Sequence, residues 1–201
     1  MENSPQQDFD NPQPEINEQP TPSYWSSIAI AGLIFGILAF ALSLISTYSV
    51  INSEPTGSYF SPLQIGIWLV TCLVAAGAGM LAIWHYEREY EVSITLGKGA
   101  LIGFLTGVAM AIIGALLNQF WQQFIDPDMM QKFVDSMIAN MEAMEMPEEQ
   151  KQQAIDMTAQ SAREGGGFFS QLLTGIPLYG VLNLITGMIG VKIFGQKKKE
   201  F

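Results

Sequence analysis

Four long, mostly apolar runs with no charged residue in their middle dominate the pattern along the chain. They cover residues 25–48, 63–84, 99–120 and 168–193. The first run would make an α-helix of about 36 Å, and the hydrocarbon core of a bilayer is about 30 Å thick. Trp25 and Tyr48 stand at its ends, where amphipathic rings favour the membrane interface. The pattern therefore predicts an all-α, integral membrane bundle of four transmembrane helices.

The first 24 residues have the opposite pattern. Residues 1–24 are polar and Pro-rich, with five acidic residues and neither Lys nor Arg. Such a segment buries too little apolar surface to offset its conformational entropy, so we expect a disordered acidic leader. Ala39-Phe40-Ala41 imitates a signal-peptide cleavage site, but a long acidic segment precedes it and the apolar run continues beyond it. We therefore exclude a signal peptide.

The segment 125–167, between the third and fourth runs, is amphipathic. Asp126-Pro127-Asp128 predicts a helix start, and Met146-Pro147-Glu148-Glu149 predicts a second one that ends before Gly165-Gly166-Gly167. Apolar residues in the first helix recur at steps of three and four, which places them on one face. We therefore expect an extramembrane helical hairpin whose apolar face is buried against the second helix, the membrane surface or another protein. The residues proposed for this partner face are Met130, Phe133, Met137, Met141 and Met144.

Lysine and arginine predict the orientation, because short loops rich in them stay in the cytoplasm. The connector 85–98 carries Arg88 and Lys98, and the basic tail 196–201 carries three lysines, whereas the turn 51–62 has none. Both termini and the connector should then be cytoplasmic, and the hairpin should lie on the far side. Helical spans argue against the β-barrel of a typical outer-membrane protein, and together with the family resemblance described below they favour the bacterial inner membrane.

Small residues recur every four positions in two of the predicted spans. Such spacing lets helix backbones approach closely in lipid, either within one bundle or between subunits. Ala111 and Ala115 continue the pattern in the third span. The predicted helix-packing residues are Gly32, Gly36, Gly99, Gly103 and Gly107.

The chain carries few residue types that perform chemistry. It has one His, one Cys, no Gly-rich phosphate loop with Lys and no His-Glu zinc motif, so we predict no enzyme, no catalytic residue and no cofactor. Met141, Met144 and Met146 are candidate Cu(I) ligands, because thioethers are soft donors. The same methionines coincide with the apolar stripe, and Met is an ordinary core residue, so packing is the favoured interpretation. A net charge of −10 argues against nucleic acid as a partner.

Three short stretches together resemble a known bacterial membrane family, the domain of unknown function 4199. They are Ile94-Thr95-Leu96-Gly97-Lys98-Gly99, then Phe124-Ile125-Asp126-Pro127-Asp128, then Met146-Pro147-Glu148-Glu149-Gln150. The resemblance covers about residues 25–195 and implies a four-span protein with no established activity. It therefore assigns no catalytic residue to this chain.

The expected function is that of a non-enzymatic membrane component that acts through protein contacts. Its partners would be the lipid bilayer and either further copies of itself or an unidentified membrane or periplasmic protein. The alternative is a small oligomeric channel or transporter for an uncharged or soft-metal solute. The absence of charged residues from the middle of the spans argues against an ion-coupled pump.

Overall fold

The computed structural model describes residues 23–58, 62–90, 93–165 and 167–195. The predicted leader, except for its last two residues, and the basic tail 196–201 lie outside these ranges. All regular structure in the described residues is helical. The helices are α1 (Trp25–Ile51), α2 (Pro62–Tyr90), α3 (Leu96–Phe120), the π-helical turn η1 (Trp121–Ile125), α4 (Met129–Glu142), α5 (Glu148–Gly165) and α6 (Phe168–Phe194).

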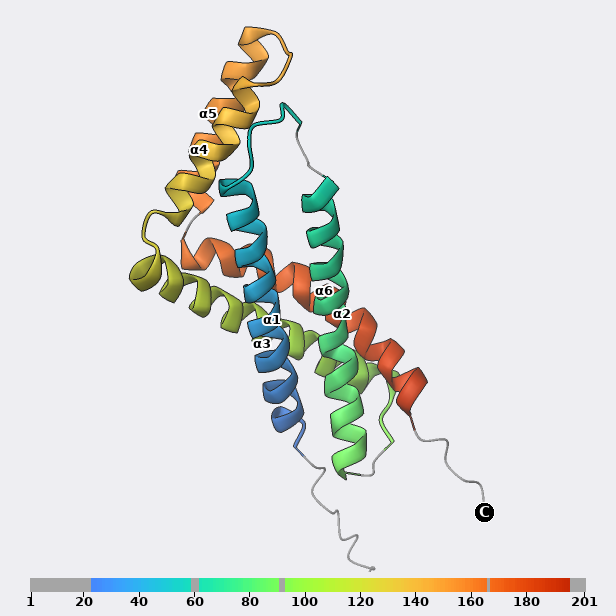
Figure 1. Ribbon diagram of the computed structural model, residues 1–201. Coiled ribbons are helices and arrows are strands. Elements are labelled where there is room, and N and C mark those ends of the chain that lie inside the picture. Colours follow the sequence, from blue (N-terminus) through green and yellow to red (C-terminus); the bar gives the residue numbers. More distant parts are fainter. Residues whose placement is uncertain (1–22, 59–61, 91–92, 166, 196–201) are drawn as a thin grey trace, which may run out of the picture.

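Four of these helices are long and apolar enough to cross a membrane. They are α1, α2, α3 continued by η1, and α6, in agreement with the four predicted spans. Figure 1 shows α1 and α2 side by side, with α3 and α6 crossing them obliquely as a second antiparallel pair. The most extensive helix–helix contact is that between α3 and α6, so this pair forms the centre of the bundle.

The predicted connector 85–98 is wrong in its first half, because α2 continues to Tyr90. Tyr86 and Glu87 are buried there, and the Tyr86 hydroxyl accepts a hydrogen bond of 2.8 Å from the Lys98 ammonium. His85 lies with its Nδ1 atom 2.9 Å from the hydroxyl of Ser27 on α1. These contacts keep the charged stretch helical, which its local sequence does not indicate.

Glycines on α3 allow its backbone to lie directly against that of α6. A methyl group added to Gly103 would overlap the carbonyl oxygen of Asn183, and one added to Gly107 would overlap that of Tyr179. A methyl group on Gly99 would overlap the side chain of Val191. The glycine stripe of the third span is therefore covered by the chain's own α6.

The glycine pair on α1 faces α3 in a looser contact. A methyl carbon on Gly32 would lie 2.9 Å from the Cβ of Ala109, and one on Gly36 would lie 2.9 Å from the Cγ2 of Ile113. These distances are longer than those from Gly103 and Gly107 to the backbone oxygens of α6. The contact of α1 with α3 is therefore less close than the backbone contact of α3 with α6.

Two asparagines link the spans, as expected for polar residues within a bundle. The fully buried Asn183 accepts a hydrogen bond of 2.7 Å from the backbone N–H of Gly79 on α2. Asn118 on α3 donates a hydrogen bond of 3.0 Å to the Oε1 atom of Gln171 on α6. Pro177 lies inside α6, as the sequence indicates.

Candidate functional site

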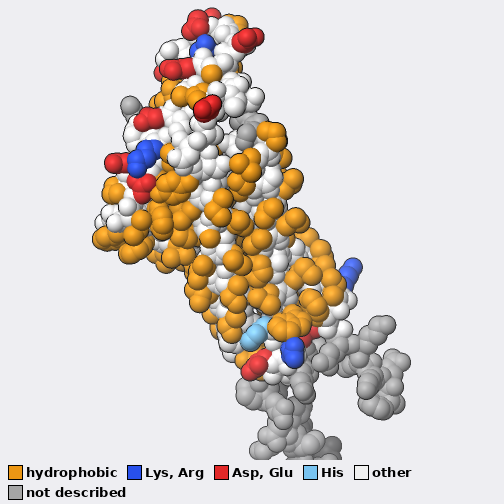
Figure 2. Space-filling view, viewed as in Figure 1, with side chains coloured by type: hydrophobic (Ala, Val, Ile, Leu, Met, Phe, Trp, Pro, Cys, Tyr) orange, Lys and Arg blue, Asp and Glu red, His pale blue; other side chains and the backbone are white. Residues whose placement is uncertain are grey.

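The hairpin of α4 and α5 extends from one end of the bundle. The two helices pack against each other and project past the end of α1 (Figure 1). Figure 2 shows charged side chains gathered on this projection and again at the opposite end, with a broad apolar band between them. The hairpin therefore begins where the apolar surface ends.

A polar cluster at this boundary joins α1, η1 and α4. The Asp126 carboxylate accepts hydrogen bonds of 2.8 Å from the Tyr48 hydroxyl and 2.9 Å from the Lys132 ammonium. The Trp121 indole N–H donates to the same Tyr48 oxygen over 3.2 Å. The hydrogen bonds from Lys132 and then Tyr48 hold the pKa of Asp126 below its ordinary value of 3.8. The bond to Asp126 raises the pKa of Lys132.

This cluster explains why the predicted helix start at Asp126 is wrong. The helix begins at Met129, with Asp128 at the N-cap and no side-chain capping bond. The carboxylate of Asp126 is instead bound to Tyr48 and Lys132, so it fixes the corner between η1 and α4.

The link between α1 and α2 is held against α4 by one side chain. The Oδ1 atom of Asn140 accepts hydrogen bonds from the backbone N–H groups of Thr56, at 2.8 Å, and Gly57, at 3.1 Å. Gly57 has a φ angle of +66°, in the left-handed region that glycine adopts without steric cost. The hairpin and the ends of α1 and α2 therefore form one continuous wall.

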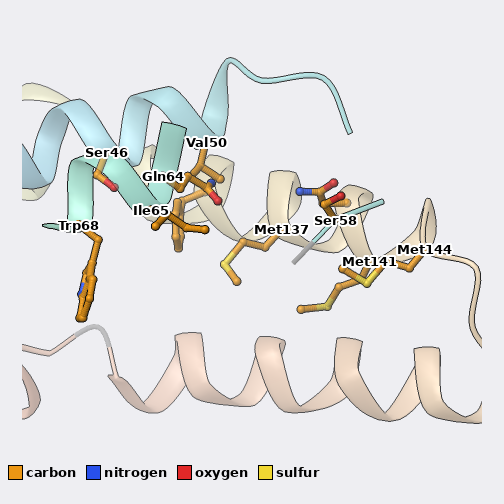
Figure 3. A pocket seen from close by; sticks show the side chains of 11 residues that line it. Ser46, Val50, Ser58, Gln64, Ile65, Trp68, Met137, Met141 and Met144 are labelled. Atoms are coloured by element: carbon orange, nitrogen blue, oxygen red, sulfur yellow. The ribbon is translucent and has the colours of Figure 1, made fainter. Parts of the chain in front are cut away.

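That wall encloses a groove of about 530 Å³, which we call the methionine groove. Figure 3 shows Met137 of α4 near Ile65 of α2, with Trp68 toward one end of this space and Met141 and Met144 toward the other. Its described lining contains no charged side chain. The lining residues are Ser46, Val50, Ser58, Gln64, Ile65, Trp68, Phe133, Met137, Asn140, Met141 and Met144.

Four of the five proposed partner-face residues line this groove. The fifth, Met130, lines a different cavity. Met141 and Met144 are only 5% and 8% exposed, and the Thr158 hydroxyl of α5 lies 3.6 Å from the sulfur of Met141. The methionine stripe is therefore turned inward and forms the side of a groove, not a flat exposed surface.

The candidate copper ligands are divided by this arrangement. Met141 and Met144 belong to the groove, whereas Met146 is not among its lining residues. Within the described ranges, no group of three or more His, Cys, Asp and Glu side chains is placed to hold a metal ion. Two of the three candidate Cu(I) ligands, Met141 and Met144, therefore lie in the same groove.

A second cavity of about 350 Å³ lies among α1, α3 and α6. It carries uncharged polar side chains, including those of Ser43, Asn118, Gln171 and Tyr179, and Met130 of α4 also lines it. Of these residues, Met130 belongs to the predicted partner face, and Asn118 is a polar residue within the predicted span 99–120. The remainder come from different helices, and no local spacing connects them.

Glu87, at the opposite end of the bundle, is a buried carboxylate, although the sequence pattern places it in the connector 85–98. It is 3% exposed, and no side chain among the described residues pairs with it. Gly79, Ile83 and Glu87 follow one another at steps of four and are all buried. This helical spacing is the signal that could have placed Glu87 inside the bundle.

The helices define an all-α protein with four helices able to cross a membrane. A family described as "Protein of unknown function (DUF4199)" matches residues 31–192, and the chain belongs to this family. The match confirms the resemblance carried by the three short stretches. No curated protein and no solved structure matches the chain.

Proposed function

We propose that the protein is a non-enzymatic component of the bacterial inner membrane that acts by contact, with the methionine groove as its contact site. The observation that carries this proposal is the groove itself. It is concave, apolar and within the 300–1,000 Å³ range typical of ligand sites. Its walls come from α1, α2 and α4, and Asp126 and Asn140 bind α4 to Tyr48 of α1 and to the link that follows α1.

The lining residues favour binding over catalysis. Ser46 and Ser58 supply hydroxyl groups, but no titratable side chain in the described lining is placed to activate them. Methionine side chains are flexible and fit irregular apolar shapes. A partner molecule of the membrane would therefore be held by an apolar group inserted into the groove.

The proposed arrangement in the membrane places the hairpin outside the bilayer on the non-cytoplasmic side. Two features support it: the apolar band that separates the charged ends in Figure 2, and the position of Arg88 and Lys98 at the end opposite the hairpin. In this arrangement both termini are cytoplasmic. The groove then opens at the outer boundary of the apolar layer.

The test is crosslinking from inside the groove in the native membrane. A photoreactive amino acid replaces Met137 in one variant and Leu173, a 78% exposed residue of α6, in the control. We expect a discrete adduct from position 137 that position 173 does not give. Identical adduct patterns from the two positions would contradict a specific contact site.

The second cavity supports the alternative function, that of a channel or transporter for an uncharged solute. Its polar side chains lie among helices that could span the membrane, where hydrogen-bonding groups would help a neutral solute to leave water. In proteoliposomes, Asn118→Leu should then lower the flux of glycerol. Joint replacement of Met137 and Met141 by Asn should leave that flux unchanged.

A further inference from the structure

We infer that the methionine groove holds one acyl chain of a membrane phospholipid with a zwitterionic, amine-bearing head group. This inference rests on the proposed function, because it names the molecule that the groove contacts. Three observations support it: the groove opens toward the lipid-facing surface, part of its apolar wall would otherwise contact water, and the surrounding charges are mostly negative.

The groove is open toward the surface that would face lipid. Ile65 is 48% exposed and Trp68 is 65% exposed, and both belong to the apolar helix α2. The next residue, Leu69, is 51% exposed. An acyl chain from the neighbouring leaflet would therefore enter the groove sideways without crossing a charged surface.

The groove also extends beyond the apolar band, and this gives a lipid chain a reason to stay. A chain that merely moves from lipid to an apolar surface gains little, because lipid is itself apolar. Phe133 and Met137, however, belong to the hairpin, on the far side of the boundary marked by Tyr48, Trp121 and Asp126, and both are only partly buried. Without an occupant, water would contact these apolar walls. An inserted chain would cover them.

The polar end of the groove suits an uncharged contact or an ammonium group. Ser58 and Asn140 provide the polar groups there, and no lining side chain would neutralise a phosphate, so the head group must carry its own cation. The segment 125–167 has nine acidic residues against three basic ones. Two of the three basic side chains are paired: Lys132 with Asp126, and Lys151 with Glu148. The surrounding field therefore repels an anionic head group and attracts an amine.

The experiment is native mass spectrometry of the full-length protein released from nanodiscs that contain equal amounts of phosphatidylethanolamine and phosphatidylglycerol. We expect one retained phospholipid per chain, with phosphatidylethanolamine enriched over its share in the disc. The double variant M137N/M141N should lose most of the retained lipid. Met157→Asn is the matched control, because Met157 is a hairpin methionine that is 61% exposed and outside the groove.

Two further variants guard against a folding defect and test the head group. Ile65→Trp narrows the groove from a half-exposed position and should also lower lipid retention without altering the buried methionines. Glu145→Gln, next to Met144, should reduce the preference for phosphatidylethanolamine without reducing the total lipid.

Each contrary outcome has a distinct meaning. Equal lipid retention by wild type, the double variant and Ile65→Trp would overturn the lipid inference. A protein adduct from position 137 together with no retained lipid would also overturn it but would leave the proposed function standing. Neither lipid nor an adduct from position 137 would overturn both. Preference for phosphatidylglycerol would overturn the head-group assignment.

Discussion

Replacement of Gly103 by Ala should separate α3 from α6 and destabilise the bundle. The added methyl group would overlap the carbonyl oxygen of Asn183 and lie 2.9 Å from the carbonyl carbon and 3.1 Å from the Cα atom of Gly187. All three atoms belong to the backbone, so no side-chain rotation relieves the contact. The two helices must move apart along their most extensive contact.

The size of the effect follows from two opposing contributions. Overpacking of this kind costs about 1–3 kcal/mol, and a helix interior favours Ala over Gly by about 1 kcal/mol. The steric contribution should prevail, because the overlap is with backbone atoms of α6 at two positions, Asn183 and Gly187. For a chain of this length, each kcal/mol of lost stability lowers the melting temperature by about 2–4 °C. We therefore expect a decrease of several degrees.

The control for this experiment lies on the same helix. Gly114→Ala makes the same chemical change on α3, but nothing lies within 4 Å of the added methyl group. Thermal unfolding of both variants in the same detergent, followed by tryptophan fluorescence, should show Gly103→Ala well below wild type and Gly114→Ala at or above it. A Gly103→Ala variant that melts with wild type would refute the close approach of α3 to α6.

Three further results are expected. Asn183→Leu removes the hydrogen bond to Gly79 and, since such bonds are worth about 0.6 kcal/mol each in a bundle, should lower the melting temperature by only a few degrees. Asp126→Asn should destabilise the protein at neutral pH in thermal melts. Because the pKa of Asp126 is lowered in the folded state, its contribution is present above 3.8 and is lost as the pH falls through the folded value, so wild type and variant should converge in acid. In a cysteine-free background, a membrane-impermeant maleimide should label Glu148→Cys in intact spheroplasts but should label Glu89→Cys only after permeabilisation. The reverse pattern would invert the proposed orientation.

The spans are predictable from the sequence because each is a long apolar run, and length and hydropathy are local properties. Their ends are not predictable in the same way. The helix α2 continues six residues beyond the predicted span, to Tyr90, although this stretch is charged. Tyr86 and Glu87 remain helical because they pack inside the bundle, and packing partners from distant segments do not register in a local pattern.

Only one wall of the methionine groove is predictable from the sequence. The four-residue spacing of Phe133, Met137 and Met141 defines a face of α4, because helical periodicity is local. The opposite wall, formed by Ile65 and Trp68, lies in a span where every face is apolar, so periodicity does not distinguish these residues from those that face lipid. The hydrogen bond from Thr56, in the link between α1 and α2, to Asn140 likewise joins residues 84 positions apart, so no local pattern predicts it.

The glycine contacts constrain where any partner can bind. A glycine stripe on a span that could face lipid would offer a surface for a second subunit, but Gly99, Gly103 and Gly107 already lie against α6. A partner helix could reach them only by displacing α6, which would also break the hydrogen bond from Asn118 to Gln171. The methionine groove requires no such displacement, because its mouth is already open beside Trp68. Contact with another membrane molecule should therefore occur at the groove first, and association between copies of the chain should depend on other surfaces than the glycine stripe.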